Sequence, residues 1–597
     1  MSCKKNAVVV ILFLMLFVLA GCPATGIRSR AIRTSSPLRA QNGLVVSAHI
    51  DASEAGVEVM KQGGNAIDAA VATGFALAVV YPVAGNMGGG GFMVVRFADG
   101  DATSFDYREK APLASVNDMY LDKDGNPVDA MSRRGHLASG VPGSVDGLLK
   151  AHAKYGKLPL KDVMAPAIRL AEHGFILTRR HAERFNANYE SFSAFPGTKR
   201  YFTKGDPTRK YVEGERFVQK DLARVLKRIE THGRAGFYEG QTAQLIVAEM
   251  ERGYGLITHE DLQAYESIER EPVVGRYRDY KIMSMPPASS GGVALVQLLN
   301  AMEPYDIREM GVNASATIHL MGEAMRRVYA DRTEWLGDSD YSDVPVKALI
   351  KKDYMRSRMA SFDPDRATAS ESVAFGSPVF YESSETTHYS VVDESGNAVS
   401  VTTTINGGFG SHVVVDGAGF FLNNEMDDFS AKPGTPNMYG LIGSQANAIE
   451  PGKRMLSSMT PTIIEDPEGR LFMVIGTPGG STIITTVFQV ILNVLDHGMD
   501  IQQAVAAPRI HHQWLPDSMK FEHGGLPRDV VVNLEKRGWT VVEREGTSGR
   551  ADGIVVSYGA DTCDVDPSQM NQIQTGTGQR LFFGGADPRG EDAAAGY

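Results

Sequence analysis

Thr386 is the residue whose chemistry stands out most in this sequence, because two different groups could act as its base. A threonine hydroxyl is a weak nucleophile until a base takes its proton. His388 lies two residues further on and on the same face of a strand, although a histidine at such a position more often has a structural role. The other base is the α-amino group of Thr386 itself, which becomes free if the chain is cut after Glu385. A free α-amine has a pKa of about 7.7–8.0, so a usable fraction is unprotonated near neutral pH.

The sequence around Thr386 predicts a β-hairpin that brings a second hydroxyl close to it. Residues 386–393 and 398–406 carry β-branched side chains in alternation, and the short loop between them contains Gly396. Glycine suits the left-handed position of a three-residue hairpin loop. The resulting register places Thr386 opposite Thr404, so that both hydroxyls lie on one face of the sheet. A threonine-rich hairpin without any catalytic role explains the same pattern.

The segment before this hairpin, residues 361–385, is rich in Ser, Asp, Glu and Pro. Such a composition is typical of an exposed linker. The regular β pattern begins abruptly at Thr386, so a cleavable linker is expected to abut a structured strand. Cleavage of the backbone there would use the same Thr386 hydroxyl against the carbonyl of Glu385.

Three glycine-rich segments must form loops, because consecutive glycines do not favour a helix. Residues 477–481 lie between a predicted strand (471–476) and a predicted helix (482–495). This arrangement points free backbone N–H groups at an oxyanion or a carboxylate. Residues 286–292 shape a second loop, and in residues 85–91 the backbone is expected to approach something closely. No Lys-Ser/Thr pair follows residues 85–91, which argues against a nucleotide-binding P-loop.

Two carboxylates, Glu425 and Asp428, lie in a turn after a predicted strand that begins at residue 419. By themselves they suggest either a metal site or paired acid–base chemistry. The adjacent His511 and His512 offer no third ligand at helix or hairpin spacing, and they are more typical of packing. The sequence therefore predicts no metal site.

The length and composition of the chain limit its architecture and partners. With 597 residues the chain is too long for one simple core, and we expect two or more folding units. Its 43% hydrophobic and 22% charged residues are typical of a soluble globular protein. The formal net charge of -11 and the lack of a long Lys/Arg run argue against nucleic acid as a partner. Helices are predicted over residues 51–80, most of residues 112–273, and residues 314–332.

The N-terminal sequence has the features of an export signal. Residues 7–20 form an apolar run that suits the core of a signal peptide and is short for a membrane span. The run ends in Leu19-Ala20-Gly21-Cys22, which resembles the bacterial lipobox, where the cysteine is lipidated and becomes the new N-terminus. A plain secretory signal or an uncleaved anchor is the alternative. Residues 23–42 are polar and basic, as in a tether, and the folded part is expected to begin near Gly43.

The hairpin sequence Thr-Thr-His-Tyr-Ser-Val-Val-Asp, residues 386–393, resembles the processing-site motif of the γ-glutamyltransferases, which are N-terminal nucleophile hydrolases. The resemblance extends over nearly the whole exported chain. Each further motif is weakly specific alone, but together and in this order they are highly specific. They are residues 85–92, 106–112, 286–292, 422–430, 453–458 and 477–481.

The resemblance implies an α+β fold, the four-layer αββα sandwich of the N-terminal nucleophile hydrolases, formed by two fragments of one precursor. Neither a metal nor an organic cofactor is implied. Two features depart from the family pattern: Glu385 before the cut, and residues 560–579, which are expected to be a surface insertion. The implied division is residues 1–21 as lipoprotein signal peptide, 22–42 as tether, 43–385 as large subunit and 386–597 as small catalytic subunit.

The same resemblance implies catalytic roles for four residues. Thr386 would be the nucleophile and the new N-terminus of the small subunit. Thr404 would hydrogen-bond to it and assist maturation. The backbone N–H groups of Gly479 and Gly480 would form the oxyanion hole.

The resemblance further implies a pocket for a zwitterion, the γ-glutamyl group with its α-carboxylate and α-ammonium. A guanidinium can bind the carboxylate through two parallel hydrogen bonds. The acidic residues would then hold the ammonium group rather than a metal. The implied residues are Arg108, Ser457 and Ser458 for the carboxylate, Asn406, Glu425 and Asp428 for the ammonium, and Tyr439 in a long loop that would form a lid.

We therefore predict a lipid-anchored γ-glutamyltransferase that acts outside the cytoplasm. It would cleave glutathione or another γ-glutamyl compound through an ester on Thr386, and pass the group to water, an amino acid or a peptide. The nearest alternative is a glutaryl (β-lactam) acylase of the same superfamily, but a glutaryl group lacks the α-ammonium that Glu425 and Asp428 would suit. An unprocessed binding lipoprotein is the alternative from a different class.

Overall fold

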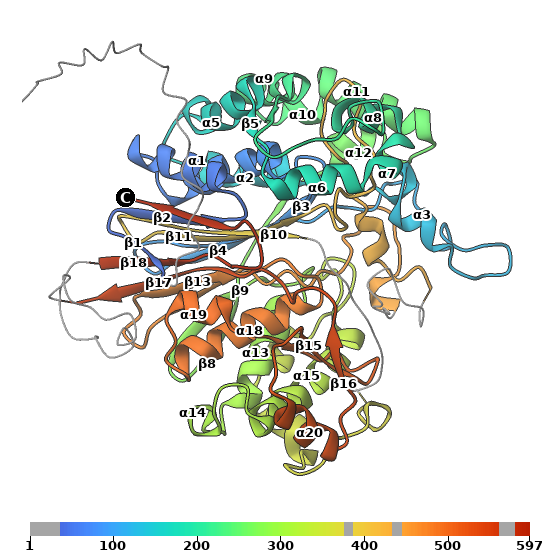
Figure 1. Ribbon diagram of the computed structural model, residues 1–597. Coiled ribbons are helices and arrows are strands. Elements are labelled where there is room, and N and C mark those ends of the chain that lie inside the picture. Colours follow the sequence, from blue (N-terminus) through green and yellow to red (C-terminus); the bar gives the residue numbers. More distant parts are fainter. Residues whose placement is uncertain (1–35, 375–385, 433–444, 560–579) are drawn as a thin grey trace, which may run out of the picture. The chain divides into compact units, whose positions relative to one another are not determined.

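Two seven-stranded antiparallel sheets lie face to face at the centre of the fold (Figure 1). The computed structural model describes residues 36–374, 386–432, 445–559 and 580–597. The sheet that carries the predicted hairpin, here called the hairpin sheet, has the order β19 (Ala593–Gly596), β2 (Gly43–Ser47), β10 (Thr387–Asp393), β11 (Ala398–Thr404), β3 (Gly90–Arg96), β4 (Ala102–Tyr107) and β7 (Ile268–Arg270). The facing sheet has the order β1 (Leu38–Ala40), β18 (Arg580–Gly585), β17 (Asp552–Tyr558), β13 (Leu471–Gly476), β12 (Thr462–Glu465), β9 (Tyr280–Ser284) and β8 (Val273–Tyr277).

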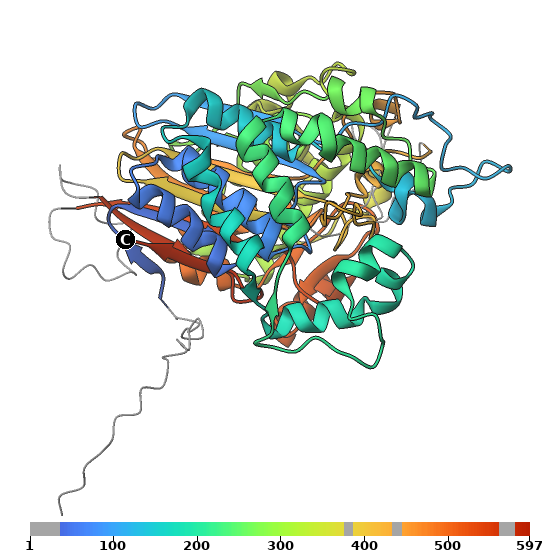
Figure 2. The ribbon, with the colours of Figure 1, turned by 90° about the horizontal axis from the view of Figure 1, so that it is seen from above.

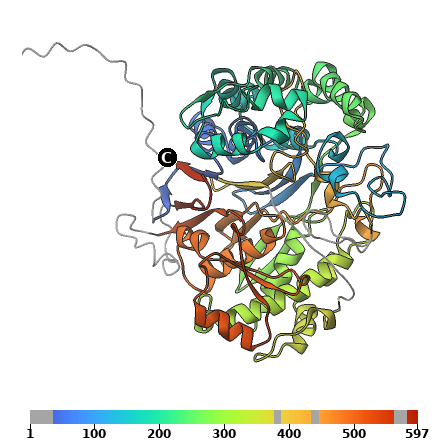
Figure 3. The same ribbon diagram turned by 45° about the vertical axis from the view of Figure 1, so that its right-hand side comes forward.

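Helices cover the outer face of each sheet and complete four layers (Figures 1 and 3). The helices over the hairpin sheet, seen from above in Figure 2, include α1 (Ile50–Lys61), α2 (Ala66–Val80), α4 (Ser144–Tyr155), α5 (Leu160–His173), α9 (Lys220–His232) and α11 (Gly240–Gly253). Those over the facing sheet include α13 (Gly291–Met302), α15 (Ser315–Trp335), α18 (Thr482–Leu495), α19 (Ile501–Ala506) and α20 (Arg528–Lys536). The predicted αββα sandwich is confirmed.

Shorter elements connect these layers. They are the helices α3 (Asp129–Arg133), α6 (Arg179–Ala187), α7 (Tyr189–Ser193), α8 (Pro196–Phe202), α10 (Ala235–Tyr238), α12 (His259–Ala264), α14 (Ile307–Met310), α16 (Val346–Leu349) and α17 (Lys352–Arg358). Two small sheets comprise β5 (Phe175–Ile176) with β6 (Arg216–Phe217), and β14 (Ile510–His511) with β15 (Met519–Glu522) and β16 (Val541–Arg544). The most relevant 3-10 turn is η4 (Glu425–Asp428).

Stacked apolar layers that share the two sheets explain why residues 35–597 do not divide into the two or more folding units predicted from the length. Val46 and Val474, from different sheets, belong to one apolar cluster between the sheets. The next residues along each strand turn to the opposite face, as strand geometry requires, so that Val45 packs under the first helical layer and Ile475 under the second. The stacked sheets bury each other's inner faces, and Ser35–Tyr597 forms one compact unit.

The hairpin is fixed at its loop end by Asp393. Gly396 has a φ of 90°, as the predicted left-handed position requires. The Asp393 carboxylate accepts hydrogen bonds from the N–H groups of Ser395 (3.0 Å) and Asn397 (2.9 Å) in the loop. It also accepts one from the N–H of Ala66 (2.9 Å) at the start of α2. The helix N-terminus favours this negative charge, so the hairpin and α2 hold each other in place.

The glycine-rich segment 85–91 lies against the protein's own backbone, which confirms the predicted close approach. A side chain on Gly88 would collide with the carbonyl oxygen of Phe421, and one on Gly89 with that of Thr404. Gly90 begins β3 and pairs with Thr404 at the open end of the hairpin. The loop is therefore shaped to let two chain segments meet beside Thr404.

Two sequence-based predictions are wrong: the start of the folded part, and the strand from residue 419. The folded part begins before Gly43, because β1 pairs with β18 and the N–H groups of residues 41 and 42 donate to the carbonyl oxygen of Tyr597. The tether predicted over residues 22–42 is therefore too long. The strand predicted from residue 419 is absent, and the backbone there makes only isolated bridges such as Val414 to Phe421.

The described part of the segment predicted as an exposed linker, residues 361–374, is mostly exposed, but two of its residues anchor it to the fold. Ser370 is fully buried and donates its hydroxyl to the carbonyl oxygen of Trp514. Thr368 donates both its N–H (3.0 Å) and its hydroxyl (2.6 Å) to the buried carboxylate of Glu323. These two polar residues satisfy buried partners, so the exposed segment is held against the fold at these points. In the described ranges, no helix has the length and apolar character required to cross a bilayer.

Candidate active site

Thr386 lies immediately before β10, at the open end of the hairpin. Thr387 pairs with Thr403, so the next step of the ladder places Thr386 opposite Thr404. The predicted register is therefore confirmed. Both threonines are almost fully buried, with 5% and 2% of their surface exposed. The Thr404 Oγ1 accepts a hydrogen bond from the N–H of Asn406 at 2.7 Å, which fixes the orientation of this hydroxyl.

The chain turns sharply after β11 at Asn406, whose φ of 68° lies in the left-handed region that asparagine tolerates. Its side-chain amide donates to the carbonyl oxygen of Asn424 at 3.0 Å. The Asn424 side chain accepts from the N–H of Gly407 at 2.8 Å. The neighbouring Asn423 donates to the carbonyl oxygen of Gly88 at 2.9 Å. These two asparagines join the hairpin to the glycine-rich segment. No role was predicted for either asparagine, although two adjacent asparagines directly after the apolar residues 420–422 were the available signal.

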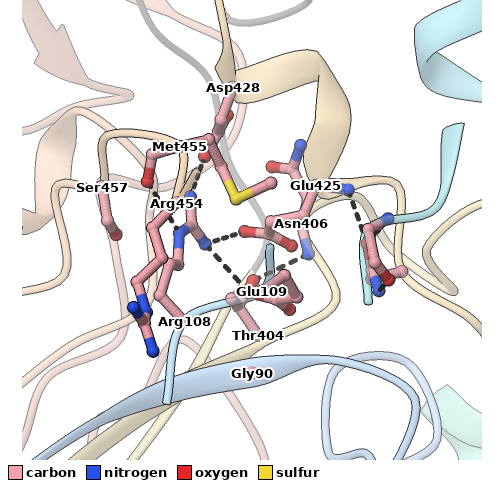
Figure 4. Close-up of polar contacts among 12 residues, drawn as sticks. Gly90, Arg108, Glu109, Thr404, Asn406, Glu425, Asp428, Arg454, Met455 and Ser457 are labelled. Carbon is pink, nitrogen blue, oxygen red and sulfur yellow. Dashed lines mark hydrogen bonds and ion pairs between the residues drawn. The ribbon is translucent and has the colours of Figure 1, made fainter. Parts of the chain in front are cut away.

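A buried cluster of charges surrounds Arg108 on the same side of the hairpin end (Figure 4). The guanidinium of Arg108 donates to both predicted carboxylates, Glu425 and Asp428. Its Nε donates to the carbonyl oxygen of Met455 at 3.2 Å. A third carboxylate, Glu109, lies 3.6 Å from the Arg108 Nη1, and it was not predicted. The structure thus brings the predicted cation and the predicted acids together in one pocket.

Burial dominates the protonation of this cluster. It raises the pKa of Glu425 well above the usual range, that of Asp428 to about 6 and that of Glu109 to about 8, with Arg108 opposing each rise. Burial also opposes the charge of Arg108, but the acids outweigh it and raise its pKa. Three buried carboxyl groups share one guanidinium, so a further positive charge among them would favour their ionised forms.

Some oxygens in this pocket lack a hydrogen-bond donor among the described residues. They are Oε2 of Glu425 and Oδ1 of Asp428. Buried carboxylate oxygens normally have partners, and an unpaired one is costly. An ammonium group would supply up to three N–H donors to these acceptors. The arrangement therefore suits a cation with N–H groups, as predicted for Glu425 and Asp428.

The serine pair lies next to this cluster along the chain that follows Met455. The Ser457 hydroxyl oxygen accepts from the N–H of Met459 at 3.2 Å, and its backbone pairs with that of Ser289. The Ser458 hydroxyl oxygen accepts from the Nη2 of Arg332 at 2.8 Å. Arg332 was not predicted, and its position in the last turn of α15 gave no signal of this contact.

The loop between β13 and α18 contains two glycines with positive φ, and their role as an oxyanion hole stays a prediction. Gly479 and Gly480 have φ values of 138° and 56°. Their carbonyl groups accept from Thr482 and Ile483 at the start of α18, at 3.1 and 3.0 Å. Neither glycine N–H donates to another described residue. The loop therefore presents two N–H groups at the positive end of a helix.

A family model described as γ-glutamyltranspeptidase matches residues 52–597. The chain belongs to the γ-glutamyltranspeptidase family. The glutathione hydrolase proenzyme of Escherichia coli is 45% identical over 552 residues, 90% of this chain and 93% of the relative. The chain is thus an enzyme of the glutathione hydrolase and γ-glutamyltransferase type.

Two solved structures support the same assignment of this γ-glutamyltranspeptidase. The cephalosporin acylase from Bacillus halodurans superposes with a TM-score of 0.80 at 26% identity, covering 98% of this chain and 99% of that one. The γ-glutamyltranspeptidase of Helicobacter pylori is 49% identical with a TM-score of 0.54, and covers 55% of this chain and 94% of that one. The second solved chain is thus much shorter than the present one, as a processed fragment would be.

His388 of this γ-glutamyltranspeptidase has the structural role that the sequence left open. Its Nδ1 contacts the Thr402 hydroxyl at 3.0 Å and its Nε2 contacts the Ser390 hydroxyl at 3.1 Å. Burial lowers its pKa to about 3, so it is a neutral histidine with both nitrogens engaged. His511 and His512 are also buried, and the described residues contain no group of three or more side chains suited to a metal ion.

Other predicted positions lie outside the described residues. They are Cys22, Glu385, Tyr439 and residues 560–579.

Proposed function

We propose that this enzyme matures by cleavage before Thr386 and then transfers γ-glutamyl groups through an ester on the Thr386 hydroxyl. The observation that carries the proposal is the open end of the hairpin, where Thr386 lies opposite Thr404 beside the pocket of Arg108. A nucleophile, a second hydroxyl and a site for a zwitterion converge there. The family membership makes γ-glutamyl compounds such as glutathione the expected substrates.

Maturation would begin when the Thr386 hydroxyl attacks the carbonyl carbon of Glu385. The peptide C–N bond breaks, the nitrogen takes the hydroxyl proton, and an ester forms between the two residues. Water then cleaves the ester, which leaves Glu385 as a carboxylate and Thr386 with a free α-amine. Thr404, which accepts from the Asn406 N–H, is positioned to direct its own proton toward the opposing hydroxyl.

In the catalytic cycle, the free α-amine of Thr386 would take the proton of its own hydroxyl during attack on the γ-carbonyl carbon. The developing negative oxygen would receive hydrogen bonds from the N–H groups of Gly479 and Gly480. Collapse of this intermediate breaks the C–N bond, and the leaving amine takes the proton. Water or an amino acceptor then attacks the ester and regenerates Thr386.

The γ-glutamyl group would exchange ion pairs within the pocket. Its α-carboxylate would bind Arg108, Ser457 and Ser458, while its α-ammonium would bind Glu425, Asp428 and the side chain of Asn406. Arg108 now donates to the two acids, so both charges of the pocket have internal partners that a zwitterion can replace pair for pair. A substrate that lacks either the α-carboxylate or the α-ammonium would leave Arg108 or the two acids, respectively, without a new partner.

The test combines chain analysis with an assay. We expect denaturing electrophoresis and intact mass to show two fragments, the smaller with Thr386 as its N-terminal residue. A wild-type chain that stays in one piece would instead support the unprocessed binding lipoprotein. The purified enzyme should release aniline from a γ-glutamyl anilide, and preference for the glutaryl anilide would support the acylase alternative, a class represented among the structural neighbours.

The export and anchoring of the chain are part of the proposal. The apolar run of residues 7–20 and Cys22 support a lipid-anchored enzyme outside the cytoplasm. Membranes from cells that express the chain should carry the activity, and detergent should release it. Replacing Cys22 by Ser should prevent lipid labelling and move the activity to the soluble exported fraction. Activity that stays in the cytoplasm of wild-type cells would contradict this part.

A further inference from the structure

Arg332 lies behind the serine pair that the proposed function assigns to the α-carboxylate. Only 3% of its surface is exposed. Its Nη2 donates to the Ser458 hydroxyl at 2.8 Å, and its Nε donates to the Ser290 hydroxyl at 2.8 Å. Ser290 donates its own hydroxyl (2.6 Å) and N–H (2.7 Å) to the carbonyl oxygen of Ser457. One guanidinium therefore fixes the side chain of Ser458 and, through Ser290, the backbone of Ser457.

These contacts determine which way the two hydroxyls are polarised. A guanidinium donates hydrogen bonds and cannot accept them. The Ser458 oxygen is therefore an acceptor toward Arg332, and its proton must point away from the guanidinium. Ser457 is set in the same way, because its oxygen accepts from the N–H of Met459 at 3.2 Å. A carboxylate accepts hydrogen bonds and does not donate them, so a serine whose oxygen accepts from the protein can use its own proton toward a carboxylate.

The charge of Arg332 also acts on the rest of the pocket. Burial raises the pKa of Asp428, and the positive charges of Arg108 and Arg332 both oppose that rise. Arg332 is therefore close enough to interact electrostatically with the acidic side of the pocket. A carboxylate bound to Ser458 would lie one hydroxyl group away from this guanidinium and would be attracted by it.

We propose that Arg332 is a positioning residue that makes the site select substrates with an α-carboxylate. It acts by holding Ser458 as a hydrogen-bond donor and by holding Ser457 in place through Ser290. This inference rests on the proposed function, because it takes both serines as ligands of the α-carboxylate. Its distinctive consequence is that Arg332 strengthens the binding of substrates that carry this carboxylate and contributes little to the binding of substrates that lack it.

Three anilides separate these contributions. The γ-glutamyl anilide has both α-substituents, the glutaryl anilide keeps only the carboxylate, and the 4-aminobutyryl anilide keeps only the amine. For Arg332→Gln we expect KM for the γ-glutamyl anilide to rise about 10- to 30-fold, the size of one lost charged hydrogen bond, with kcat changed less than about threefold. The kcat/KM for the glutaryl anilide should fall similarly, and that for the 4-aminobutyryl anilide by less than about twofold.

A double-mutant cycle shows whether Arg332 acts through Ser458. Ser458→Ala alone should raise KM for the γ-glutamyl anilide, and adding Arg332→Gln should then cost much less than in the wild type. Arg332→Lys keeps the charge and one hydrogen-bond donor, so we expect KM for the γ-glutamyl anilide to rise only about threefold. If Arg332→Gln is not cut at Thr386, Arg332→Lys becomes the test. Its loss of kcat/KM should then be confined to the anilides that carry the carboxylate.

Arg327 provides the matched control, because it lies on the same helix and is equally buried. It pairs with Glu323 at 2.5 Å and donates to the carbonyl oxygen of Arg358 at 2.8 Å. Arg327→Gln should lower stability without changing the preference among the anilides. If Arg332→Gln lowers kcat/KM equally for all three anilides, or for none of them, the inference about Arg332 is overturned and the proposed function still stands. A wild type that does not prefer the γ-glutamyl over the 4-aminobutyryl anilide would overturn the proposed function, and this inference with it.

Discussion

The two halves of the active site are built in different ways. The hairpin end with Thr386 and the Gly479–Gly480 loop are defined by backbone: strand register, a helix start and left-handed glycines. The pocket around Arg108 is defined by side chains from separate segments, whose charges are buried and paired with each other. The first half contains no Asp, Glu, Lys or Arg side chain at Thr386, Thr404, Gly479 or Gly480. In the second half, the burial of charged groups costs free energy, and new ion pairs with a bound zwitterion would offset that cost.

This difference predicts separate consequences for chemistry and recognition. A change at the backbone-built half should abolish bond making while the pocket still binds its ligand. A change in the pocket should weaken binding while the chain still cuts itself, because maturation involves no γ-glutamyl group. Variants of each half therefore test whether the division is real.

The largest effect is expected for Thr386→Ala. This variant should stay a single chain and lose transfer by at least about 10⁴-fold, because it lacks the only hydroxyl that serves both cleavage and catalysis in the proposed mechanism. Gel electrophoresis and the γ-glutamyl anilide assay measure both outcomes. Thr386→Ser is the control, and it should be cut slowly and keep part of the activity. Efficient cutting of the alanine variant would refute the assignment.

Arg108→Gln should give the next largest effect, on recognition rather than on maturation. The variant loses the charged hydrogen bonds to the carboxylate, and kcat/KM for the γ-glutamyl anilide should fall about 100-fold. Arg108→Lys should recover little, because an ammonium cannot bind a carboxylate through two parallel bonds. Both variants should still yield two fragments. Failure to mature with an intact fold would show that the two halves are not separable.

The sequence predicted the backbone-built half better than the pocket, and the reason is physical. The register of Thr386 and Thr404 follows from a short loop and side-chain alternation, which are local properties. The bounds of β13 and α18 on either side of the Gly479–Gly480 loop were also predicted correctly. Arg332 was missed because its role depends on a contact with Ser458, which is distant in the sequence. Glu109 is adjacent to Arg108 in the sequence, but its burial next to that guanidinium is a property of the tertiary fold. Residues 361–374 are mostly exposed, as their composition predicts, but that composition did not reveal the contact of Thr368 with the buried Glu323.

Glu109→Gln tests the stored charge of the pocket. Burial raises the pKa of Glu109 from 4.5 to about 8. The folded protein therefore keeps this proton at pH values where the unfolded chain has lost it, so stability falls as the pH rises from about 4.5 to about 8. The glutamine variant has no charge to bury, and it should be more stable than the wild type by about 1–3 kcal/mol at pH 9 and similar to it near pH 4.5. Urea unfolding at both pH values measures the difference.

Glu323→Gln is the control with the opposite sign. Burial opposes the charge of Glu323 too, but the Thr368 hydroxyl and the guanidinium groups of Arg326 and Arg327 outweigh it and lower its pKa. This carboxylate stabilises the fold above the pKa of the unfolded state, so its loss should weaken the protein at neutral pH and matter less in acid. Equal pH profiles for the two variants would contradict the picture of a pocket that stores unfavourable charge.

The smallest effect is expected at the loop of the hairpin, far from its catalytic end. Gly396→Ala places a side chain at a φ of 90° and against the end of the Arg580 side chain, which is flexible enough to move. The cost should be about 1 kcal/mol of folding stability with full maturation and activity. Gly469→Ala, with a φ of 79° and open space around it, should cost about the same from backbone strain alone. The ladder of β10 and β11, and not the loop, holds Thr386 opposite Thr404, so a loss of maturation in Gly396→Ala would show that the register depends on the loop after all.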